Sequence, residues 1–422
     1  MDILKLFLEN PIICTDTRQI KDGSIFFALK GDNFNGNTFA VKALDLGSAY
    51  AIVDEANEEQ DPRIILVDNV LEALQNLACA YRQMFDFPFF AITGSNGKTT
   101  TKELMREVLS KKFKVHATKG NFNNHLGVPL TLLSMPKDTD FAIIEMGANH
   151  VKEIEALCRI AQPDHGMITN IGQAHLEGFG GLAGVIRGKS ELYSHLRESR
   201  GTVFLNKDME HLQSAIGDGS YIPYGQKSES FELRSIASGT NVHFSANIDN
   251  DKYEVQTQLT GQYNMANFAS AIAVGLHFGV PSKDICAAIA DYTPDNQRSQ
   301  ITKTSRNTLI LDAYNANPTS MKEALKNLYA VNKEDGFFIL GDMFEMGVRS
   351  AELHQEIVDL ASQLGLSGIV VGKAFAESRT NFLAYESKEG LTDYLKKNSL
   401  QGKTVLIKGS RGMKLEEIVD LL

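Results

Sequence analysis

The chain has 422 residues, of which 43% are hydrophobic and 22% are charged, and its formal net charge is −10. This length predicts about three domains, each large enough to bury a core of its own. The acidic balance argues against a nucleic-acid-binding protein, which normally has an excess of basic residues, although a local cationic site for small anions remains open.

The cysteines and the first residues of the chain indicate in which cellular compartment the protein is expected. The four cysteines, at positions 14, 79, 158 and 286, are widely spaced and form no CxxC pair. This spacing favours reduced thiols over a disulfide framework or a zinc site. The first ten residues are too short and too charged for a signal peptide, and no apolar run of ~18 residues is found. We therefore expect a soluble cytoplasmic protein without a membrane-inserted segment.

Residues 1–87 alternate short apolar runs with helical patterns, which predicts a small α/β domain that ends near Asp86 and Pro88. The polar cluster from Thr15 to Arg18 precedes the first strand. It is typical either of a capped turn with a solvated arginine or of a ligand contact, and the residues alone leave both readings open. The expected elements are strands at 24–29, 49–53 and 64–67 and helices at 39–46 and 70–84.

A phosphate-binding turn begins the next segment. An uninterrupted apolar run from Phe89 reads as a buried strand, a Gly-containing turn follows, and helix-forming residues begin at Thr100. Such a turn offers backbone N–H groups and a helix N-terminus to phosphate oxygens, with Lys98 toward the β- and γ-phosphates and the Thr99 hydroxyl toward Mg²⁺. The generic motif has its first glycine five residues before the second, but here that position is Ile92.

Polar residues also follow the later strands of this segment. The asparagine-rich loop 120–129, which contains Asn123 and Asn124, suits either a loop that folds against a ligand or a plain turn. The strand 141–147 contains Glu145 near its carboxyl end, where a carboxylate of a nucleotide-binding sheet can hold Mg²⁺ directly or through water. Buried strands without alternation predict a parallel sheet that is covered on both faces.

His175, Lys189 and the segment 225–260 complete the central region. His175 follows the strand 166–171, which is a site position in this architecture, although a core or surface histidine remains an alternative. Lys189 lies in a predicted helix from 182 to 197; because most helical lysines are solvated, the residues alone assign it no role. Alternating stretches within 225–260 predict an antiparallel patch.

The last domain is predicted to be a compact, doubly wound α/β unit, reached through a linker at 294–298. The segment 261–267 opens a helix that runs to about Phe278, precedes the linker and presents Asn264 and Asn267 on one face, where they can bind a ligand. The basic turn 408–414 is either solvated or in contact with a phosphate or carboxylate. Strands are expected at 308–311, 337–340, 368–371 and 404–407, and helices at 319–332, 350–365, 389–398 and 413–422.

These strings together resemble the Mur ligases, the ATP-dependent amide-forming enzymes of peptidoglycan precursor synthesis. The resemblance covers nearly the whole chain, and the shortened Gly-x-x-Gly-Lys-Thr turn is what this family shows. The strings are TGSNGKTTTKE (93–103), GNFNNHLGVPLTLL (120–133), EMGANH (145–150), NIGQAHLEGFG (170–180), GQYNMAN (261–267) and LDAYNANPTSM (311–321).

The resemblance implies an α/β protein of three domains. A small N-terminal α/β domain (1–87) would bind the UDP end of the substrate. A central P-loop ATPase domain with a parallel sheet (88–294) would hold ATP and two Mg²⁺, and a C-terminal doubly wound, Rossmann-like domain (295–422) would close over it. The implied activity is that of the family member that joins D-Ala-D-Ala to UDP-N-acetylmuramoyl-tripeptide through an acyl phosphate, in the cytoplasm and as a monomer, within cell-wall biogenesis and cell division.

The resemblance also implies site residues by position. Catalytic roles fall to Lys98, Lys189 and His175, and Lys189 matches the family lysine that reacts with CO₂ to become a carbamate. The expected metal ligands are Thr99, Glu145, His175 and Lys189. The expected ATP contacts are Gly94, Ser95, Asn96, Gly97, Lys98, Thr99, Thr100, Asn264, Asn267, Arg298, Asp312, Tyr314 and Asn315. The expected substrate contacts are Thr17, Arg18, Asn123, Asn124, Lys408, Ser410 and Arg411.

Three other functions stay open at this point. Two belong to the same superfamily: a ligase that adds diaminopimelate or lysine, and folylpolyglutamate synthase. The Tyr-Asn-Ala-Asn-Pro string at 314–318 favours the dipeptide-adding enzyme, because the Asp-Asn-Pro-Arg string expected of the diaminopimelate-adding ligase is absent from the sequence. The third is a nucleotide-binding switch without ligase chemistry, which would not need Glu145, His175 and Lys189 beside Lys98.

Overall fold

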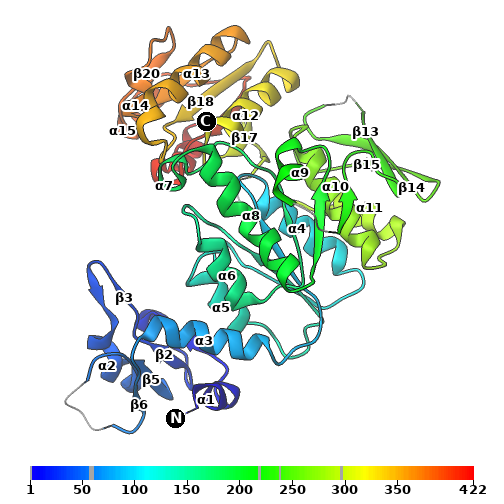
Figure 1. Cartoon of the computed structure of the whole chain (residues 1–422). Helices are drawn as coiled ribbons and strands as arrows, with labels where there is room; N and C mark the ends of the chain where they lie inside the picture. Colours follow the sequence, from blue (N-terminus) through cyan, green and yellow to red (C-terminus); the bar gives the residue numbers. More distant parts are fainter. Residues whose placement is uncertain (1, 57–60, 217–219, 237–238, 295–297) are drawn as a thin grey trace.

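The computed structural model describes residues 2–56, 61–216, 220–236, 239–294 and 298–422. Its elements form three α/β units that follow one another in chain order, with the N-terminal unit far from the C-terminal one (Figure 1). The described part of the chain contains no helix that is long and apolar enough to cross a membrane.

The N-terminal unit is built on a parallel sheet of four strands in the order β1-β2-β5-β6. Ile25 and Phe27 of β2 pack into one buried cluster and Phe26, between them, into another. Both faces of this sheet are therefore covered, as parallel strands require. The elements are α1 (Ile3–Glu9), β1 (Ile13–Cys14), β2 (Ile25–Phe27), β3 (Lys30–Gly31), β4 (Phe34–Asn35), α2 (Ala40–Asp45), β5 (Tyr50–Val53), β6 (Ile64–Leu66) and α3 (Val70–Arg82).

Helix α3 joins the N-terminal unit to the central one. The Tyr81 hydroxyl donates to the carbonyl of Met135 at 3.0 Å. Arg82 Nε donates to the carbonyl of Ala161 at 3.0 Å, and the guanidinium carbon lies 3.6 Å from the centre of the Phe89 ring. These contacts place the C-terminal half of α3 against the strand that leads into the phosphate turn.

The central sheet has six parallel strands in the order β12-β11-β10-β7-β9-β8. Strand β7 lies between β9 and β10, so the chain leaves it toward one side and later returns on the other. A crevice opens at the carboxyl ends of strands at such a point. The elements are β7 (Phe89–Thr93), α4 (Lys98–Leu109), β8 (Val115–Ala117), α5 (Gly127–Leu133), β9 (Phe141–Glu145), α6 (Glu153–Ala161), β10 (His165–Ile168), α7 (Leu176–Phe179), α8 (Leu182–Glu198), β11 (Thr202–Asn206), α9 (Glu210–Ile216) and β12 (Tyr221–Tyr224).

A three-stranded antiparallel sheet and two helices complete the central unit. The sheet confirms the antiparallel patch predicted within 225–260 for the described residues. Helix α10 packs against α4, and their apolar side chains share one buried cluster with Phe90 of β7. The elements are β13 (Phe231–Ile236), β14 (His243–Ile248), β15 (Asp251–Gln256), α10 (Asn264–His277) and α11 (Ser282–Asp291).

The C-terminal unit has a six-stranded sheet in the order β16-β17-β21-β18-β19-β20. Its strands are parallel except for the edge strand β16, which runs antiparallel to β17. This sheet completes the third α/β unit, and the predicted fold class of three α/β units is confirmed. The elements are β16 (Gln300–Lys303), β17 (Thr308–Asp312), α12 (Pro318–Val331), β18 (Gly336–Gly341), α13 (Ser350–Gln363), β19 (Ser367–Val371), α14 (Lys373–Ala376), β20 (Leu383–Tyr385), α15 (Lys388–Lys397) and β21 (Thr404–Lys408).

Two predictions about the C-terminal part need comment. The helix expected at 413–422 is found in part: the structure has a 3-10 helix, not an α-helix, at Leu415–Leu421, and a second short 3-10 helix at Arg411–Met413. Lys414 between them has φ of 50°, a left-handed conformation that no α-helix can include. Most of the linker predicted at 294–298 lies outside the described residues.

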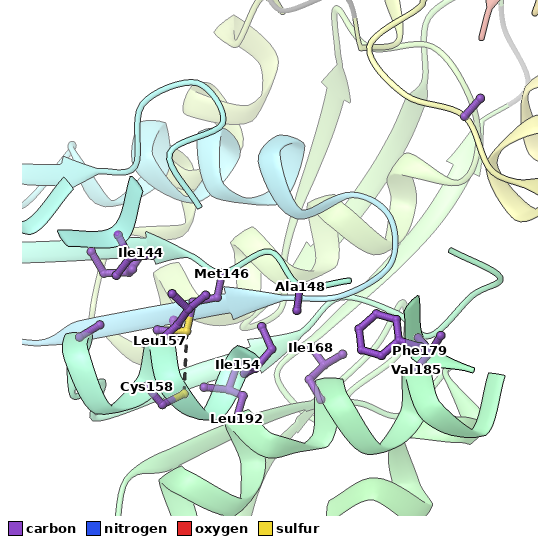
Figure 2. Packing of buried hydrophobic residues seen from close by; sticks show 14 of the residues in the cluster. Ile144, Met146, Ala148, Ile154, Leu157, Cys158, Ile168, Phe179, Val185 and Leu192 are labelled. Carbon is purple, nitrogen blue, oxygen red and sulfur yellow. Dashed lines mark hydrogen bonds between the residues drawn. The ribbon is translucent and has the colours of Figure 1, made fainter. Parts of the chain in front are cut away.

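A buried cluster supports the carboxyl end of β9. Figure 2 shows Ile144, Met146 and Ala148 packed against side chains of α6 and α8. The sulfur atoms of Met146 and Cys158 lie 3.8 Å apart. Because Glu145 stands between Ile144 and Met146, this packing holds its backbone in place.

Candidate active site

The phosphate turn connects β7 to α4 and is already shaped for an anion. Gly97 adopts φ of 78° directly before the helix, and a Cβ there would lie 2.7 Å from Asn267 Oδ1. Lys98 is the first helical residue, and its Nζ donates to the carbonyl of Gly94 at 2.7 Å. Burial of the ammonium lowers the pKa of Lys98 to about 8; the charge of Glu145 opposes this shift and that of Arg298 adds to it.

The end of β10 holds this turn in place. The Asn96 N–H donates to Asn170 Oδ1 at 3.0 Å, and Asn170 Nδ2 donates back to the Asn96 carbonyl at 2.9 Å. Thr169 Oγ1 donates to the same carbonyl at 2.6 Å. A Cβ on Gly94 would lie 2.1 Å from Thr169 Oγ1, so this neighbour also explains the first glycine. Hydrogen bonds with Thr169 and Asn170 therefore stabilise the turn.

A cavity of about 1090 Å³ opens at the carboxyl ends of the central strands and reaches the C-terminal unit. It brings together most of the residues predicted from three separate parts of the chain. Those that line it are Ser95, Asn96, Gly97, Lys98, Thr100, Asn123, Asn124, Glu145, His175, Asn264, Asn267, Arg298, Asp312, Tyr314, Asn315 and Lys408.

A second cavity, of about 760 Å³, runs along α4 and shares Arg298 and Tyr314 with the first. Thr99 lines this second cavity. The predicted residues that line neither cavity are Thr17, Arg18, Gly94, Lys189, Ser410 and Arg411.

Two buried oxygens near the phosphate turn fit a cation. Thr99 Oγ1 and Glu145 Oε2 have no hydrogen-bond partner among the described residues, although both side chains are buried. The other carboxylate oxygen of Glu145 accepts from Asn123 Nδ2 at 2.8 Å, and its N–H donates to Thr118 Oγ1 at 2.9 Å. Oxygen ligands of this kind are those that Mg²⁺ prefers. Within the same described ranges no cluster of three or more His, Cys, Asp or Glu side chains forms a metal site.

Lys189 is almost completely buried, with 1% of its surface exposed. Its Nζ donates to the carbonyl of Ala148 at 3.0 Å and lies 5.2 Å from the centre of the Phe179 ring. Burial, together with the charge of Lys98, moves the pKa of Lys189 well below its ordinary value. The sequence pattern of a solvated helical lysine was therefore misleading, because the side chain points into the core beneath the site.

His175 lies at the mouth of the main cavity and is paired with a residue from another unit. Its Nδ1 is hydrogen-bonded to Glu345 Oε2. The same bond lowers the pKa of the Glu345 carboxyl below its usual value. The alternative of a core histidine is wrong, because the His175 side chain is 27% exposed.

Asn264 and Asn267 support the phosphate helix. Asn267 Nδ2 donates to Asn264 Oδ1 at 2.7 Å, and Thr101 Oγ1 of α4 donates to Asn267 Oδ1 at 3.1 Å. Asn264 Nδ2 donates to the carbonyl of Thr260 at 2.7 Å. Both residues line the main cavity, and part of their hydrogen-bonding capacity is directed at each other and at α4.

The C-terminal unit adds a buried ion pair. Lys408 is 2% exposed, and its Nζ lies 2.6 Å from Asp312 Oδ2 and 3.0 Å from the carbonyl of Asn315. The solvated reading of Lys408 is therefore wrong, because the side chain is buried against Asp312 and Asn315. Two residues further on, Ser410 Oγ accepts the N–H of Phe344 at 2.9 Å.

Tyr314 lies against two guanidinium groups. The Arg298 guanidinium carbon is 3.8 Å from the centre of its ring, and that of Arg411 is 4.8 Å away. Arg298 Nε is buried and lacks a hydrogen-bond partner within the described ranges. The cluster brings together Arg298 of the predicted linker, Tyr314 after β17 and Arg411 of the basic turn, and the first two of these residues line both cavities.

Thr17 and Arg18 lie in the N-terminal unit, in a capped turn. Asp16 caps the short 3-10 helix Thr17–Gln19, and Arg18 Nε and Nη2 donate to its carboxylate at 2.9 and 2.7 Å. This ion pair lowers the pKa of Asp16 to about 2. The Arg18 side chain is 87% exposed, so it can contact a ligand while staying attached to Asp16.

Several residues around the site were not predicted individually. Asn317 and Asn170 stand inside the strings that carried the family resemblance, but no role was assigned to them. Lys102 is completely buried and its Nζ donates to the carbonyl of Thr118, whose hydroxyl accepts from Glu145. Glu345 follows strand β18, and its position after the carboxyl end of a parallel strand is the signal that could have identified it.

The fold and the site define a P-loop nucleotide-binding protein with α/β units on either side of its central sheet. Three family models match the chain: the Mur ligase family catalytic domain at 11–82, the Mur ligase middle domain at 92–275 and the Mur ligase glutamate ligase domain at 297–411. The chain belongs to the Mur ligase family.

Full-length relatives agree with this assignment. The chain is 36% identical to UDP-N-acetylmuramoyl-tripeptide–D-alanyl-D-alanine ligase of Bacillus subtilis, over 97% of this chain and 93% of that one. It is 33% identical to the ligase of the same name from Escherichia coli, with the same coverage. A crystal structure of MurF from Acinetobacter baumannii superposes with a TM-score of 0.88 at 30% identity, covering 97% of this chain and 92% of that one.

Proposed function

We propose that this protein is an ATP-dependent ligase that joins D-Ala-D-Ala to the C-terminal carboxylate of UDP-N-acetylmuramoyl-tripeptide and releases ADP and phosphate. The observation that carries the proposal is the meeting of the phosphate turn, Glu145 and the C-terminal residues Asp312 and Lys408 in one cavity. Relatives that bear this enzyme's name align over nearly the whole chain. The reaction serves peptidoglycan precursor synthesis, and we place the enzyme in the cytoplasm as a monomer.

The nucleotide is proposed to bind with its phosphates in the turn before α4. Backbone N–H groups at the start of α4 and the Lys98 ammonium face the phosphate oxygens, where positive charge is needed. The other ATP contacts are proposed at the predicted positions, with the base and ribose near Tyr314 and Asp312. The Arg298 Nε without a partner among the described residues supports a role in binding an anion there.

Thr99, Glu145 and His175 are proposed to hold two Mg²⁺ ions beside the phosphates. The unpaired Thr99 Oγ1 and Glu145 Oε2 support this assignment within the described residues. Bound Mg²⁺ would neutralise charge on the phosphate oxygens during transfer. Asn123 holds the Glu145 carboxylate by one oxygen and leaves the other free to ligate.

Lys189 is proposed to be carbamylated. A neutral amine adds to CO₂, loses a proton and becomes a carbamate. The modified side chain is therefore an anion, whereas an ordinary protonated lysine is a cation. Its buried amine with a lowered pKa supports the neutral form that this reaction needs. A carbamate next to Ala148 would add negative charge on the Glu145 side of the cavity, where two cations require it.

The reaction then needs mainly positioning and electrostatics. The tripeptide carboxylate attacks the γ-phosphorus of ATP, and ADP leaves while an acyl phosphate forms. The Lys98 ammonium would face the oxygens that gain charge, and Lys408 of the basic turn lines the same cavity. The free amine of D-Ala-D-Ala attacks the acyl carbon, and phosphate leaves from the tetrahedral intermediate. Contact of the C-terminal unit with the cavity would limit access of water to the acyl phosphate.

We further propose that the three units act as the segments 1–87, 88–294 and 295–422. In this division Thr17 and Arg18 of the first segment contact the UDP part of the substrate. Asn123, Asn124, Lys408, Ser410 and Arg411 would face its peptide end or the incoming dipeptide.

The experiment that tests the proposal measures ADP release by the full chain with ATP and Mg²⁺. We expect release only when UDP-N-acetylmuramoyl-tripeptide and D-Ala-D-Ala are both present. A product with free diaminopimelate or lysine, or with glutamate and a folate, would instead assign the chain to another activity of the superfamily. ADP release that needs neither acceptor nor donor would indicate a nucleotide switch.

A further inference from the structure

Glu345 reaches the active-site histidine from a different unit of the molecule. It lies in the loop after β18, whereas His175 begins α7 of the central unit, and Figure 1 shows α7 beside the C-terminal unit. Two contacts join Glu345 to the start of α7: a bond between Glu345 Oε2 and His175 Nδ1, and a bond from the Glu177 N–H to the Glu345 carbonyl at 3.2 Å. Glu345 itself does not line the main cavity, whereas His175 does.

The C-terminal unit holds the loop of Glu345 in a defined position. The Met343 N–H donates to His354 Nε2 at 3.0 Å, and the Phe344 N–H donates to Ser410 Oγ at 2.9 Å. His354 is completely buried, and its Nδ1 donates to the carbonyl of Ser350 at 2.7 Å. Two successive backbone groups before Glu345 are therefore fixed by buried side chains, so the carboxylate is presented by a rigid loop.

Both partners have unusual backbone conformations. His175 has φ of 52° and Glu345 has φ of 63°, which is the left-handed region that non-glycine residues seldom occupy. Such conformations persist where surrounding structure imposes them, and they concentrate at functional sites. Here they turn the two side chains toward each other across the boundary between the units.

We propose that Glu345 is a positioning residue for His175, and that it orients the imidazole only when the C-terminal unit is docked on the central one. This inference rests on the proposed function. A carboxylate on one ring nitrogen fixes the orientation of an imidazole and leaves the other nitrogen for a ligand. With Nδ1 bonded to Glu345, Nε2 is the nitrogen that remains for the cavity. The site is thus complete only after contact between two units that the chain separates by 170 residues.

A purely structural role for the pair predicts different behaviour. The Glu345 side chain is 48% exposed, and exposed ion pairs contribute little to stability. If Glu345 acts by orienting His175, its loss should leave thermal unfolding nearly unchanged and reduce turnover. If the pair only ties the units together, thermal unfolding should change and turnover should follow it.

The test compares Glu345→Ala, Glu345→Gln, His175→Ala and the double alanine variant in the full chain. Glu352→Ala is the matched control, because Glu352 forms an exposed ion pair with Arg349 close to the same loop. We expect Glu345→Ala to lower kcat about 10- to 100-fold, the usual effect of losing a carboxylate that orients a ligating histidine. Glu345→Gln keeps an acceptor for Nδ1–H and should recover most of that loss. In the double alanine variant, kcat should be no lower than in His175→Ala alone.

A second readout does not depend on turnover. Mn²⁺ binding in the presence of a non-hydrolysable ATP analogue, followed by electron paramagnetic resonance, should weaken about tenfold in Glu345→Ala and stay unchanged in the control. Unchanged Mn²⁺ affinity, additive losses in the double variant or wild-type kcat in Glu345→Ala would each overturn the inference. If the wild-type chain itself does not need both peptide substrates for ADP release, the proposed function fails instead, and the Mn²⁺ comparison still decides the role of Glu345.

Discussion

Asn317 of α12 and Asn96 of the phosphate turn face each other across the boundary between the C-terminal and central units. Asn317 Nδ2 donates to Asn96 Oδ1 at 2.7 Å, and the reverse contact measures 3.5 Å. Asn317 also caps α12, because its Oδ1 accepts the Ser320 N–H at 2.9 Å. Thr319 Oγ1, in the first turn of the same helix, accepts the Gln173 N–H at 3.2 Å. The start of one helix therefore packs directly on the loops that shape the phosphate site.

The two functions of Asn317 can be separated by substitution. Asn317→Ala loses both the cap and the amide pair, whereas Asn317→Ser keeps a capping oxygen and loses only the pair. We expect the alanine variant to be less stable than the serine variant by about 1 kcal/mol, measured by urea unfolding. Both variants should raise the KM for ATP, as should Asn96→Ala. Equal stability of the alanine and serine variants would show that the cap does not stabilise α12.

Lys98 should make ATP binding depend on pH. Its pKa in the free protein is about 8, so the ammonium that phosphates require is present below that pH and lost above it. Bound phosphates favour the charged form, so binding above pH 8 must include uptake of a proton. We expect the Kd for ATP to be flat below this pH and to rise about tenfold per pH unit above it, measured by calorimetry.

Two variants control this experiment. Lys98→Arg keeps its charge at all these pH values, so its Kd should show no break near pH 8, whatever its absolute affinity. Lys98→Ala should nearly abolish ADP formation while the fold remains intact. A wild-type Kd that stays constant up to pH 10, or near-normal turnover by Lys98→Ala, would remove Lys98 from the phosphate site.

Arg18 should act on one substrate only. Arg18→Ala is expected to raise the KM for UDP-N-acetylmuramoyl-tripeptide and to leave the KM for ATP nearly unchanged, because the residue is exposed and lines neither cavity. Arg63→Ala is the matched control. Arg63 forms the same type of local ion pair with Asp61 two residues away, in the same unit. Equal effects of the two variants on this KM would mean that Arg18 only stabilises its own turn and does not contact the substrate.

We expect Lys189 to be essential for activity in its carbamylated, anionic form. Lys189→Ala is expected to lose most activity and to regain part of it with added short carboxylates, which can occupy the vacated anionic position. A short alkylammonium ion of similar size should not restore activity. Rescue by the ammonium and not by the carboxylate would show that the unmodified amine acts at this position. Mass spectrometry of the native protein at raised CO₂ measures the carbamate directly.

The sequence alone was sufficient for the local features of the site. A buried strand, a Gly-containing turn and a helix are patterns of neighbouring residues, so the phosphate turn between Thr93 and Lys98 could be predicted from them. The parallel class of the central sheet followed in the same way, because its strands are apolar without alternation. The helix predicted at 413–422 is present only as the 3-10 helix Leu415–Leu421, which starts after the left-handed Lys414, and composition does not reveal such a residue.

Tertiary structure decided which side chains meet. Lys189 looked like a solvated lysine and Lys408 like part of an exposed basic turn, but both are buried. Packing of α8 against the end of β9 buries the first, and the pairing of β21 with β17 places the second beside Asp312. The contacts of His175 with Glu345 and of Asn96 with Asn317 join residues 170 and 221 positions apart. Their partners are set by how whole sheets and helices dock, which depends on burial summed over many residues and leaves no local pattern in the sequence.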